Sequence, residues 1–306
     1  MKTVSVFAPA SIGNVGPGFD LLGMAIAGIG DTVVATRCRE SGVLITRVSG
    51  STNLPLDPNK NTAGIAAQSV LQHLGQCDGV SLRLHKGVPG SGLGSSAASA
   101  VAASYAVNLL FGRKLSKQEL VPIAAVAELE VSGGFFLDNI GASMIGGVTW
   151  NNPFTQEVVS LGKVPGVVIV IAVPDFSLLT RESRKVLPAA IPMQDFVWNM
   201  AYASMITWAA AKNNPERFGR AIQDRVAEPA RAPLITGFED VKEGALAAGA
   251  YGCSISGAGA SLFAITDEIS KGKKIGQAMK KGFAKHHVGT KILVTRIDPQ
   301  GVRQIK

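Results

Sequence analysis

Residues 88–99 form a glycine-rich stretch whose residue types and spacing could do chemistry. Three glycines, Gly90, Gly92 and Gly94, fall within five positions. Glycine lets backbone N–H groups converge on one point without a Cβ in the way. The uncharged, alanine-rich residues 96–111 behind them predict a helix. The pattern therefore predicts a glycine-rich loop that leads into a helix N-terminus, which is a binding site for phosphate.

Two serines at the start of this helix add hydroxyl groups to the predicted site. Ser95 and Ser96 can cap the helix or bind Mg²⁺. The stretch is not a P-loop, because no lysine follows the glycines, and Gly90-x-Gly92-x-Gly94 does not have the spacing of a Rossmann fingerprint. The alternative that needs no ligand is a turn before a buried, alanine-rich helix.

Composition limits the class of protein to which this chain can belong. The chain has 306 residues, of which 46% are hydrophobic, so one large or two moderate domains can fold without disulfides. The three cysteines, Cys38, Cys77 and Cys253, lie far apart, which favours a reducing compartment. The N-terminus lacks the apolar core of a signal peptide, and the apolar run at residues 166–173 is too short to span a bilayer. We therefore expect a cytoplasmic protein with no membrane partner.

The net charge of +8 could indicate a nucleic acid, an anionic membrane or an anionic small molecule as partner. The densest lysine cluster, residues 271–285, is interleaved with Ile275, Met279 and Phe283. This spacing predicts an amphipathic surface helix with a solvated lysine face. No aromatic stacking platform accompanies the lysines, so we expect no nucleic-acid partner.

The elements that position these residues are a mixture of strands and helices, and the sequence predicts an α+β protein rather than a doubly wound sheet. The predicted strands cover residues 3–8, 31–38, 43–48, 80–85, 167–173 and 291–297, with a strand pair in 253–266. The predicted helices cover residues 62–74, 96–111, 117–131, 196–211, 215–224 and 239–248, besides the lysine helix. Turn residues between 152 and 166 suggest two domains, 1–160 and 161–306.

Two further glycine-rich patches, at residues 13–20 and 254–261, flank the first one along the chain. The segment Pro89-Gly-Ser-Gly-Leu-Gly-Ser-Ser-Ala97 resembles the phosphate loop of the GHMP kinase superfamily, and the two flanking patches resemble its other signatures. The resemblance implies a two-domain α+β fold. Its N-terminal domain would resemble ribosomal protein S5, its C-terminal domain would be ferredoxin-like, and the active site would lie in the cleft between them.

Within that superfamily the chain is most similar to the homoserine kinases. The segments Ala8 to Asp20, Thr180 to Pro188 and Glu228 to Arg231 resemble motifs of that family, and Asp138-Asn139 matches its acidic motif. The resemblance implies transfer of a phosphoryl group from ATP to the side-chain hydroxyl of L-homoserine, on the route to threonine. Two positions depart from the family pattern, because Phe136 and Ala142 stand where a histidine and a proline are common.

The resemblance assigns roles to individual residues. It implies that ATP is bound by Asn61, Pro89, Gly90, Ser91, Gly92, Leu93, Gly94, Ser95, Ser96 and Ala97. It implies that homoserine is bound by Asn14, Asp20, Asp138, Asn139, Arg184, Arg231 and Gly257. Arginine can hold the α-carboxylate with two hydrogen bonds, and aspartate can pair with the ammonium group.

Asp138 and Asn139 are the candidate catalytic residues, and Asp138 acts either as a base toward the attacking hydroxyl or as a substrate binder. ATP chemistry requires Mg²⁺, for which Ser96 offers a hydroxyl group and Glu128 a carboxylate. Glu128 lies at the offset from Asp138 at which the family has its metal ligand, and Glu130 is then the exposed neighbour.

Three functions compete: a homoserine kinase, a GHMP kinase for another alcohol or sugar, and a nucleotide-binding homologue without activity. Arg184 and Arg231 favour the first over the second, and the metal pair Ser96 and Glu128 argues against the third. The sequence leaves a homodimer open.

Overall fold

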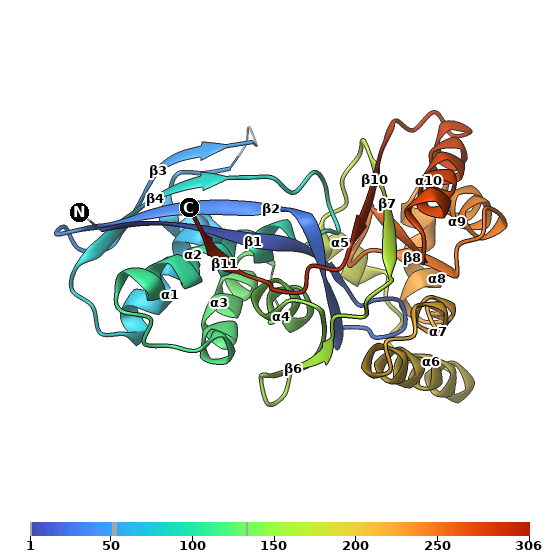
Figure 1. The fold of residues 1–306 in the computed structure, drawn as a ribbon, viewed down its shortest axis with the longest axis horizontal. Coiled ribbons are helices and arrows are strands. Elements are labelled where there is room, and N and C mark those ends of the chain that lie inside the picture. The colour runs from blue at the N-terminus through green and yellow to red at the C-terminus, as the bar shows by residue number, and fades with distance from the viewer. Residues whose placement is uncertain (1, 51–53, 133) are drawn as a thin grey trace.

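The computed structural model describes residues 2–50, 54–132 and 134–306, and within these ranges the chain forms two β-sheets with helices packed against them (Figure 1). The larger sheet has the order β11-β1-β2-β4-β3, and β5 pairs with β2 and with β6. Its strands are β1 (Thr3–Gly13), β2 (Leu22–Cys38), β3 (Val43–Ser49), β4 (Gly79–His85), β5 (Val148–Asn152), β6 (Glu157–Gly162) and β11 (Arg303–Ile305).

The helices of the first half cover one face of the larger sheet (Figure 1). They are α1 (Thr62–His73), α2 (Ser95–Leu110), α3 (Lys117–Ser132) and α4 (Leu137–Ile145), with the short 3₁₀ helix η1 (Pro58–Lys60) before α1. Helix α2 is apolar on nearly all sides and packs against both the sheet and the other three helices. The predicted capping box of α3 is confirmed, because Ser116 and Glu119 exchange hydrogen bonds between side chain and backbone.

The smaller sheet is antiparallel with the order β10-β7-β9-β8. Its strands are β7 (Val168–Pro174), β8 (Gly252–Ile255), β9 (Leu262–Thr266) and β10 (Thr290–Arg296). Every residue of β7 is buried, as the continuous apolar run predicts. Val170 and Ala172 face one core, whereas Ile169 and Ile171 face another, so alternate side chains of one strand join the two layers.

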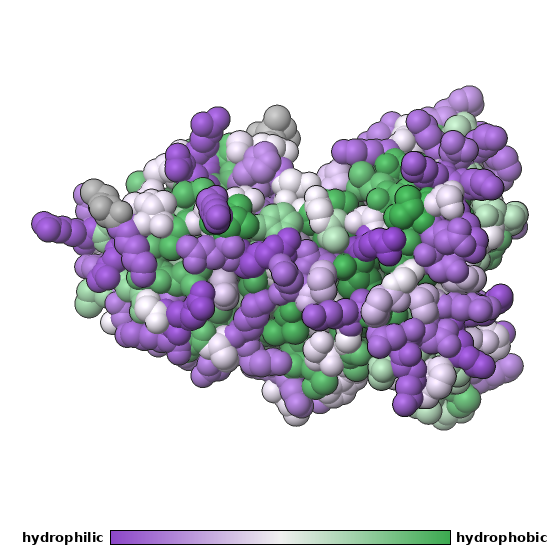
Figure 2. Space-filling view, in the orientation of Figure 1, coloured by the Kyte–Doolittle hydropathy of each residue, from purple (hydrophilic) through white to green (hydrophobic). Residues whose placement is uncertain are grey.

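Several helices of the second half pack against this sheet. The helices of this half are α5 (Thr180–Lys185), α6 (Met193–Ala211), α7 (Pro215–Arg220), α8 (Ala227–Arg231), α9 (Phe238–Ala247) and α10 (Ile269–Ala284), with η2 (Ala232–Leu234) after α8. The predicted lysine helix is confirmed as α10, which buries Ile275, Met279 and Phe283. Figure 2 shows hydrophilic side chains over α10 on the outer surface.

The helix predicted over residues 215–224 is too long at its C-terminal end, because α7 ends at Arg220. Asp224 belongs to the next turn instead. Its carboxylate accepts hydrogen bonds from the backbone N–H groups of Ala227 and Glu228, at 3.1 and 2.9 Å. The side chain therefore supports the start of α8 rather than the end of α7.

One hydrophobic core joins the two halves of the chain. Ile12 and Met24 from the larger sheet belong to the same buried cluster as Ile169 and Phe263 from the smaller one. The chain also returns to the larger sheet at its end, where β11 pairs with β1 in antiparallel fashion. The division into 1–160 and 161–306 stays a prediction, and its boundary falls within β6. Among the described residues, no helix has the length and apolar character to cross a membrane.

Candidate active site

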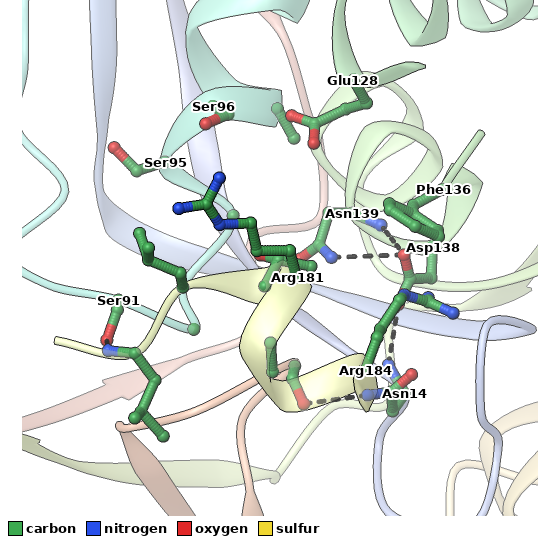
Figure 3. A pocket seen from close by; sticks show the side chains of 18 of the residues that line it. Asn14, Ser91, Ser95, Ser96, Glu128, Phe136, Asp138, Asn139, Arg181 and Arg184 are labelled. Atoms are coloured by element: carbon green, nitrogen blue, oxygen red, sulfur yellow. Dashed lines mark hydrogen bonds between the residues drawn. The ribbon is translucent and has the colours of Figure 1, made fainter. Parts of the chain in front are cut away.

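Residues from both halves line a cavity of about 790 Å³, shown in Figure 3. The loop between β1 and β2, the glycine-rich loop before α2, the start of α4, and helices α3, α5 and α8 all contribute. The predicted site residues that line it are Asn14, Asp20, Gly90, Ser91, Gly92, Gly94, Ser95, Ser96, Ala97, Glu128, Asp138, Asn139, Arg184, Arg231 and Gly257. The fold thus brings together residues that lie up to 243 positions apart, such as Asn14 and Gly257.

The glycine-rich loop ends in α2, as the sequence predicts. Gly92 and Gly94 have positive φ angles of 82° and 63°, and Gly94 is the N-cap residue of α2. A Cβ on Gly92 would collide with the carbonyl oxygen of Ser256, and one on Gly94 would collide with Ser11 Oγ. Both positions therefore require glycine for space as well as for conformation. The first N–H groups of α2 have no partner within the helix, so they are donors for a phosphate at this end of the cavity.

The third glycine-rich patch holds this loop in place. Ser91 Oγ accepts a hydrogen bond from the backbone N–H of Ala260 at 2.9 Å, and Ser261 Oγ donates to the carbonyl of Ser91 at 2.7 Å. Ser256 Oγ donates to the carbonyl of Gly92 at 2.5 Å. These bonds join the first half of the chain to the second half at the floor of the cavity.

Three residues of the predicted ATP set, Asn61, Pro89 and Leu93, are not among the residues that line the cavity. Asn61 is the N-cap of α1, and its side chain accepts a hydrogen bond from the N–H of Ala63 at 3.0 Å. Leu93 is fully buried in the core between the two halves. Pro89 is half-buried before the loop turns inward. In this structure the roles of Asn61 and Leu93 are a helix cap and a core side chain.

A buried charge cluster, which no sequence motif predicts, lies beneath the phosphate end of the cavity. The ammonium group of Lys86 contacts the carboxylate of Asp31 and donates to Ser99 Oγ at 2.6 Å and to the carbonyl of Ser95 at 2.8 Å. Asp31 also accepts a hydrogen bond from the N–H of Gly87 at 3.0 Å. The cluster ties β2, the start of the glycine-rich loop and the first turn of α2 to one another.

Asp138 and Asn139, in the first turn of α4, form the acidic part of the site. Asp138 is 3% exposed and accepts hydrogen bonds from the N–H groups of Asn14 and Asn139, at 3.0 and 2.9 Å. Burial, together with the charge of Asp20, raises the pKa of Asp138 to about 6, although these N–H donors act in the opposite direction. The carboxylate is therefore ionised at neutral pH and is a better proton acceptor than an ordinary aspartate.

The two predicted arginines lie at the other end of the cavity. Arg184 Nη2 donates to Asp20 Oδ1 at 2.6 Å. Arg231 is 3% exposed and donates to the carbonyl oxygens of Ser183 and Gly257, at 3.1 and 3.0 Å. Burial lowers the pKa of Arg231 from its ordinary value. The guanidinium groups of Arg184 and Arg231 thus border the same space as the carboxylate of Asp20, an arrangement that suits a zwitterion.

Ser96 and Glu128 offer oxygen ligands at the phosphate end. Figure 3 shows the carboxylate of Glu128 pointing toward the first turn of α2, where Ser96 lies. Glu128 is 8% exposed, whereas Glu130 is exposed on the same helix. Mg²⁺ in phosphate sites commonly takes one or two carboxylates and completes its shell with phosphate oxygens and water. A hydroxyl and one buried carboxylate beside a phosphate site fit this requirement.

Comparison with known proteins identifies the class to which this site belongs. Residues 61–147 match the family described as GHMP kinases N terminal domain, and residues 206–285 match the family described as GHMP kinases C terminal. A mevalonate kinase of known structure from L. major, 17% identical, superposes with a TM-score of 0.71 over 96% of this chain and 95% of that one. The fold is that of a GHMP kinase, and the chain belongs to this superfamily.

More similar relatives refine this class. The chain is 42% identical to the homoserine kinase of Arabidopsis thaliana, over 99% of this chain and 85% of the relative. It is 36% identical to the homoserine kinase of Methanocella arvoryzae, over 100% and 98% of the two chains. The crystal structure of homoserine kinase from Cytophaga hutchinsonii superposes with a TM-score of 0.94 at 39% identity, covering 100% and 98%. The chain belongs to the homoserine kinase family.

Proposed function

We propose that this protein transfers the γ-phosphoryl group of ATP to the side-chain hydroxyl of L-homoserine, giving O-phospho-L-homoserine and ADP on the route to threonine. One observation carries the proposal. The glycine-rich loop and the N-terminus of α2 share a single cavity with Arg184 and Arg231 and with Asp20 and Asp138. A phosphate donor and a zwitterionic acceptor can therefore meet in one site.

The phosphate groups of ATP would lie on the glycine-rich loop and the first turn of α2. The N–H groups of Ser95 and Ser96 are suited to bind phosphate oxygens there. Mg²⁺ would be held by Ser96 and Glu128, and it would neutralise charge on the phosphate oxygens during transfer. The buried ion pair of Lys86 and Asp31 would hold this loop in place from behind.

The acceptor would bind at the opposite end. Arg231 and Arg184 would hold its α-carboxylate, and Asp20 would pair with its ammonium group. Asp138 would accept a hydrogen bond from the side-chain hydroxyl, which orients the attacking oxygen toward the γ-phosphorus. As the new P–O bond forms and the bond to ADP breaks, the hydroxyl proton has the Asp138 carboxylate beside it as an acceptor.

We expect ADP release to be much faster with homoserine than with mevalonate, galactose or shikimate. The reason is that only homoserine offers both an ammonium group to Asp20 and a carboxylate to the two arginines. A coupled ADP-release assay over these four alcohols, with Mg²⁺ and ATP, measures this directly. Equal or faster turnover with one of the other alcohols would assign the cavity to that acceptor, and ATP binding without turnover of any alcohol would indicate a nucleotide-binding protein.

Removing either arginine should weaken acceptor binding. We expect Arg231→Ala and Arg184→Ala to raise the KM for homoserine by about 30- to 1000-fold, which corresponds to a loss of roughly 2–4 kcal/mol for a shielded charged hydrogen-bonded pair. The effect should be larger for Arg231, which is 3% exposed, than for Arg184, whose side chain is 29% exposed. The KM for ATP should stay near its original value. Steady-state kinetics with each substrate varied in turn provide the measurement.

The control for both variants is 3-aminopropan-1-ol, which is homoserine without its carboxylate. Arg231→Ala and Arg184→Ala should lose little activity toward this amino alcohol beyond the low activity of the unchanged protein. Lysine should restore neither site, because it keeps the charge but lacks the planar pair of donors. An equal loss with both acceptors would mean that the arginines act on the phosphates or on the fold.

A cytoplasmic location and a homodimer stay predictions. The first rests on the three free cysteines, one of which, Cys253, is buried. Measuring the molar mass by light scattering would determine whether the protein is a monomer or a dimer.

A further inference from the structure

An aromatic ring covers one face of the Arg184 guanidinium group. Cζ of Arg184 lies 3.8 Å from the ring centroid of Phe136, the residue immediately before α4. Phe136 lines the cavity, and Figure 3 shows it beside Arg184. A second ring, that of Phe19, lies 5.3 Å from the guanidinium carbon of Arg184 and 5.3 Å from that of Arg231. Both arginines of the acceptor end are therefore in contact with aromatic rings.

Hydrogen bonds alone do not fix the orientation of Arg184. Its Nη2 donates to Asp20, but its Nε is buried and has no hydrogen-bond partner within the described part of the chain. One bond leaves a long side chain free to rotate about the bonded atom. Contact with a ring restricts that rotation, because a guanidinium group stacks through its face and donates hydrogen bonds along its edge.

Phe136 is not part of the packing that holds α4 on the sheet. Its neighbour Phe135 packs against the large core of the first half, whereas Phe136 turns toward the cavity. The backbone makes room for the ring at Gly134, where a Cβ would collide with the ring atoms of Phe136. The ring thus lies close to Gly134 and to the guanidinium group of Arg184.

We propose that Phe136 is a positioning residue that acts through Arg184: its ring sets the plane of the guanidinium group so that the edge meets the carboxylate of the acceptor. The inference rests on the proposed function, because it concerns the same acceptor end of the cavity. By orienting Arg184, Phe136 would favour acceptors that carry a carboxylate. Phe136 itself contacts no reacting atom in this scheme.

Phe136→Leu tests the proposal, since it keeps an apolar side chain and removes the aromatic face. The expected result is a rise of about 3- to 20-fold in the KM for homoserine, in line with a partly desolvated cation–π contact. The kcat value and the KM for ATP should stay within about twofold. Phe136→Tyr, which retains the ring, should restore the KM for homoserine. Phe136→Met serves as a second ring-free variant if the leucine variant does not fold.

Two further measurements separate positioning from simple packing. First, Phe136→Leu should leave kcat/KM for 3-aminopropan-1-ol nearly unchanged, because this acceptor has no carboxylate. Second, Phe136→Leu should have no further effect on the KM for homoserine when it is introduced into Arg184→Ala. A loss that is equal for the two acceptors, or that persists without Arg184, would overturn the proposal and leave the ring as a wall of the cavity.

Trp198→Leu is the matched control. Trp198 stacks on Arg225 with 3.4 Å from Cζ to the ring centroid, and neither residue lines the cavity. The control should leave the KM for homoserine unchanged. The unchanged protein distinguishes the two proposals: if it does not phosphorylate homoserine, the proposed function fails. If it phosphorylates homoserine and Phe136→Leu behaves like Trp198→Leu, only the inference about Phe136 fails.

Discussion

Glu128→Gln should lower kcat by roughly two to four orders of magnitude and weaken the binding of Mg²⁺-ATP, as expected when a charge-stabilising ligand is lost from a phosphoryl-transfer site. Glu128 is 8% exposed and lines the cavity near the first turn of α2, so solvent screens its charge only weakly. Glutamine has nearly the same shape but lacks the charge. Kinetics at increasing Mg²⁺ concentrations, with calorimetry of Mg²⁺-ATP binding, measure both effects.

The comparison variant is Glu130→Gln. Glu130 borders the same cavity from the same helix, but it is exposed, so water screens the loss of its charge. We expect its kcat to stay close to that of the unchanged protein. If the two variants exchange their behaviour, the metal ligand lies on the other side of α3.

Lys86→Met should lower the free energy of unfolding by about 3–5 kcal/mol, because it leaves a buried carboxylate without its counter-charge. Asp31 is fully buried, and the side chain of Lys86 is 7% exposed. The same change should weaken ATP binding, since Lys86 and Asp31 hold both the start of the glycine-rich loop and the first turn of α2. Urea denaturation and calorimetry with ATP provide the two readouts.

The double variant Asp31→Asn with Lys86→Met should recover much of the lost stability, because no unpaired charge then remains. Lys285→Met, which breaks an ion pair with Asp240 at the surface, should change stability little. A small effect of Lys86→Met, similar to that of Lys285→Met, would mean that Asp31 finds another partner or takes up a proton.

The parts of the fold that could be predicted are those with a strong local pattern. Strand β7 is continuous and apolar, α10 alternates lysines with a buried stripe, and α2 follows its glycines directly. Helix α4, which carries Asp138, is not predicted from the sequence. It has only nine residues and contains a glycine at position 141, so its local helix pattern is weak. That glycine is needed because a Cβ there would collide with the side chain of Asn151.

The site could be predicted only as separate motifs. Residue type and motif order bring the glycine-rich loop, Asp138 and Arg231 to attention, but they do not show which of them meet. The pair Lys86 and Asp31 has no motif at all, because its partners are 55 positions apart and each looks like an ordinary strand residue. Pairing of β2 with β4 brings them together, and that register is a property of the whole sheet.

The hydrogen bonds between the glycine-rich loop at Ser91 and Gly92 and residues 256–261 restrict how the cavity can open for substrates. These hydrogen bonds join the two halves of the chain at the cavity, and the hydrophobic core that contains Ile12 and Phe263 joins them below it. A hinge motion that separates the two halves would have to break these hydrogen bonds and expose the shared core. We therefore expect substrates to enter the cavity without such a motion, past the short helix α5, which carries Arg184.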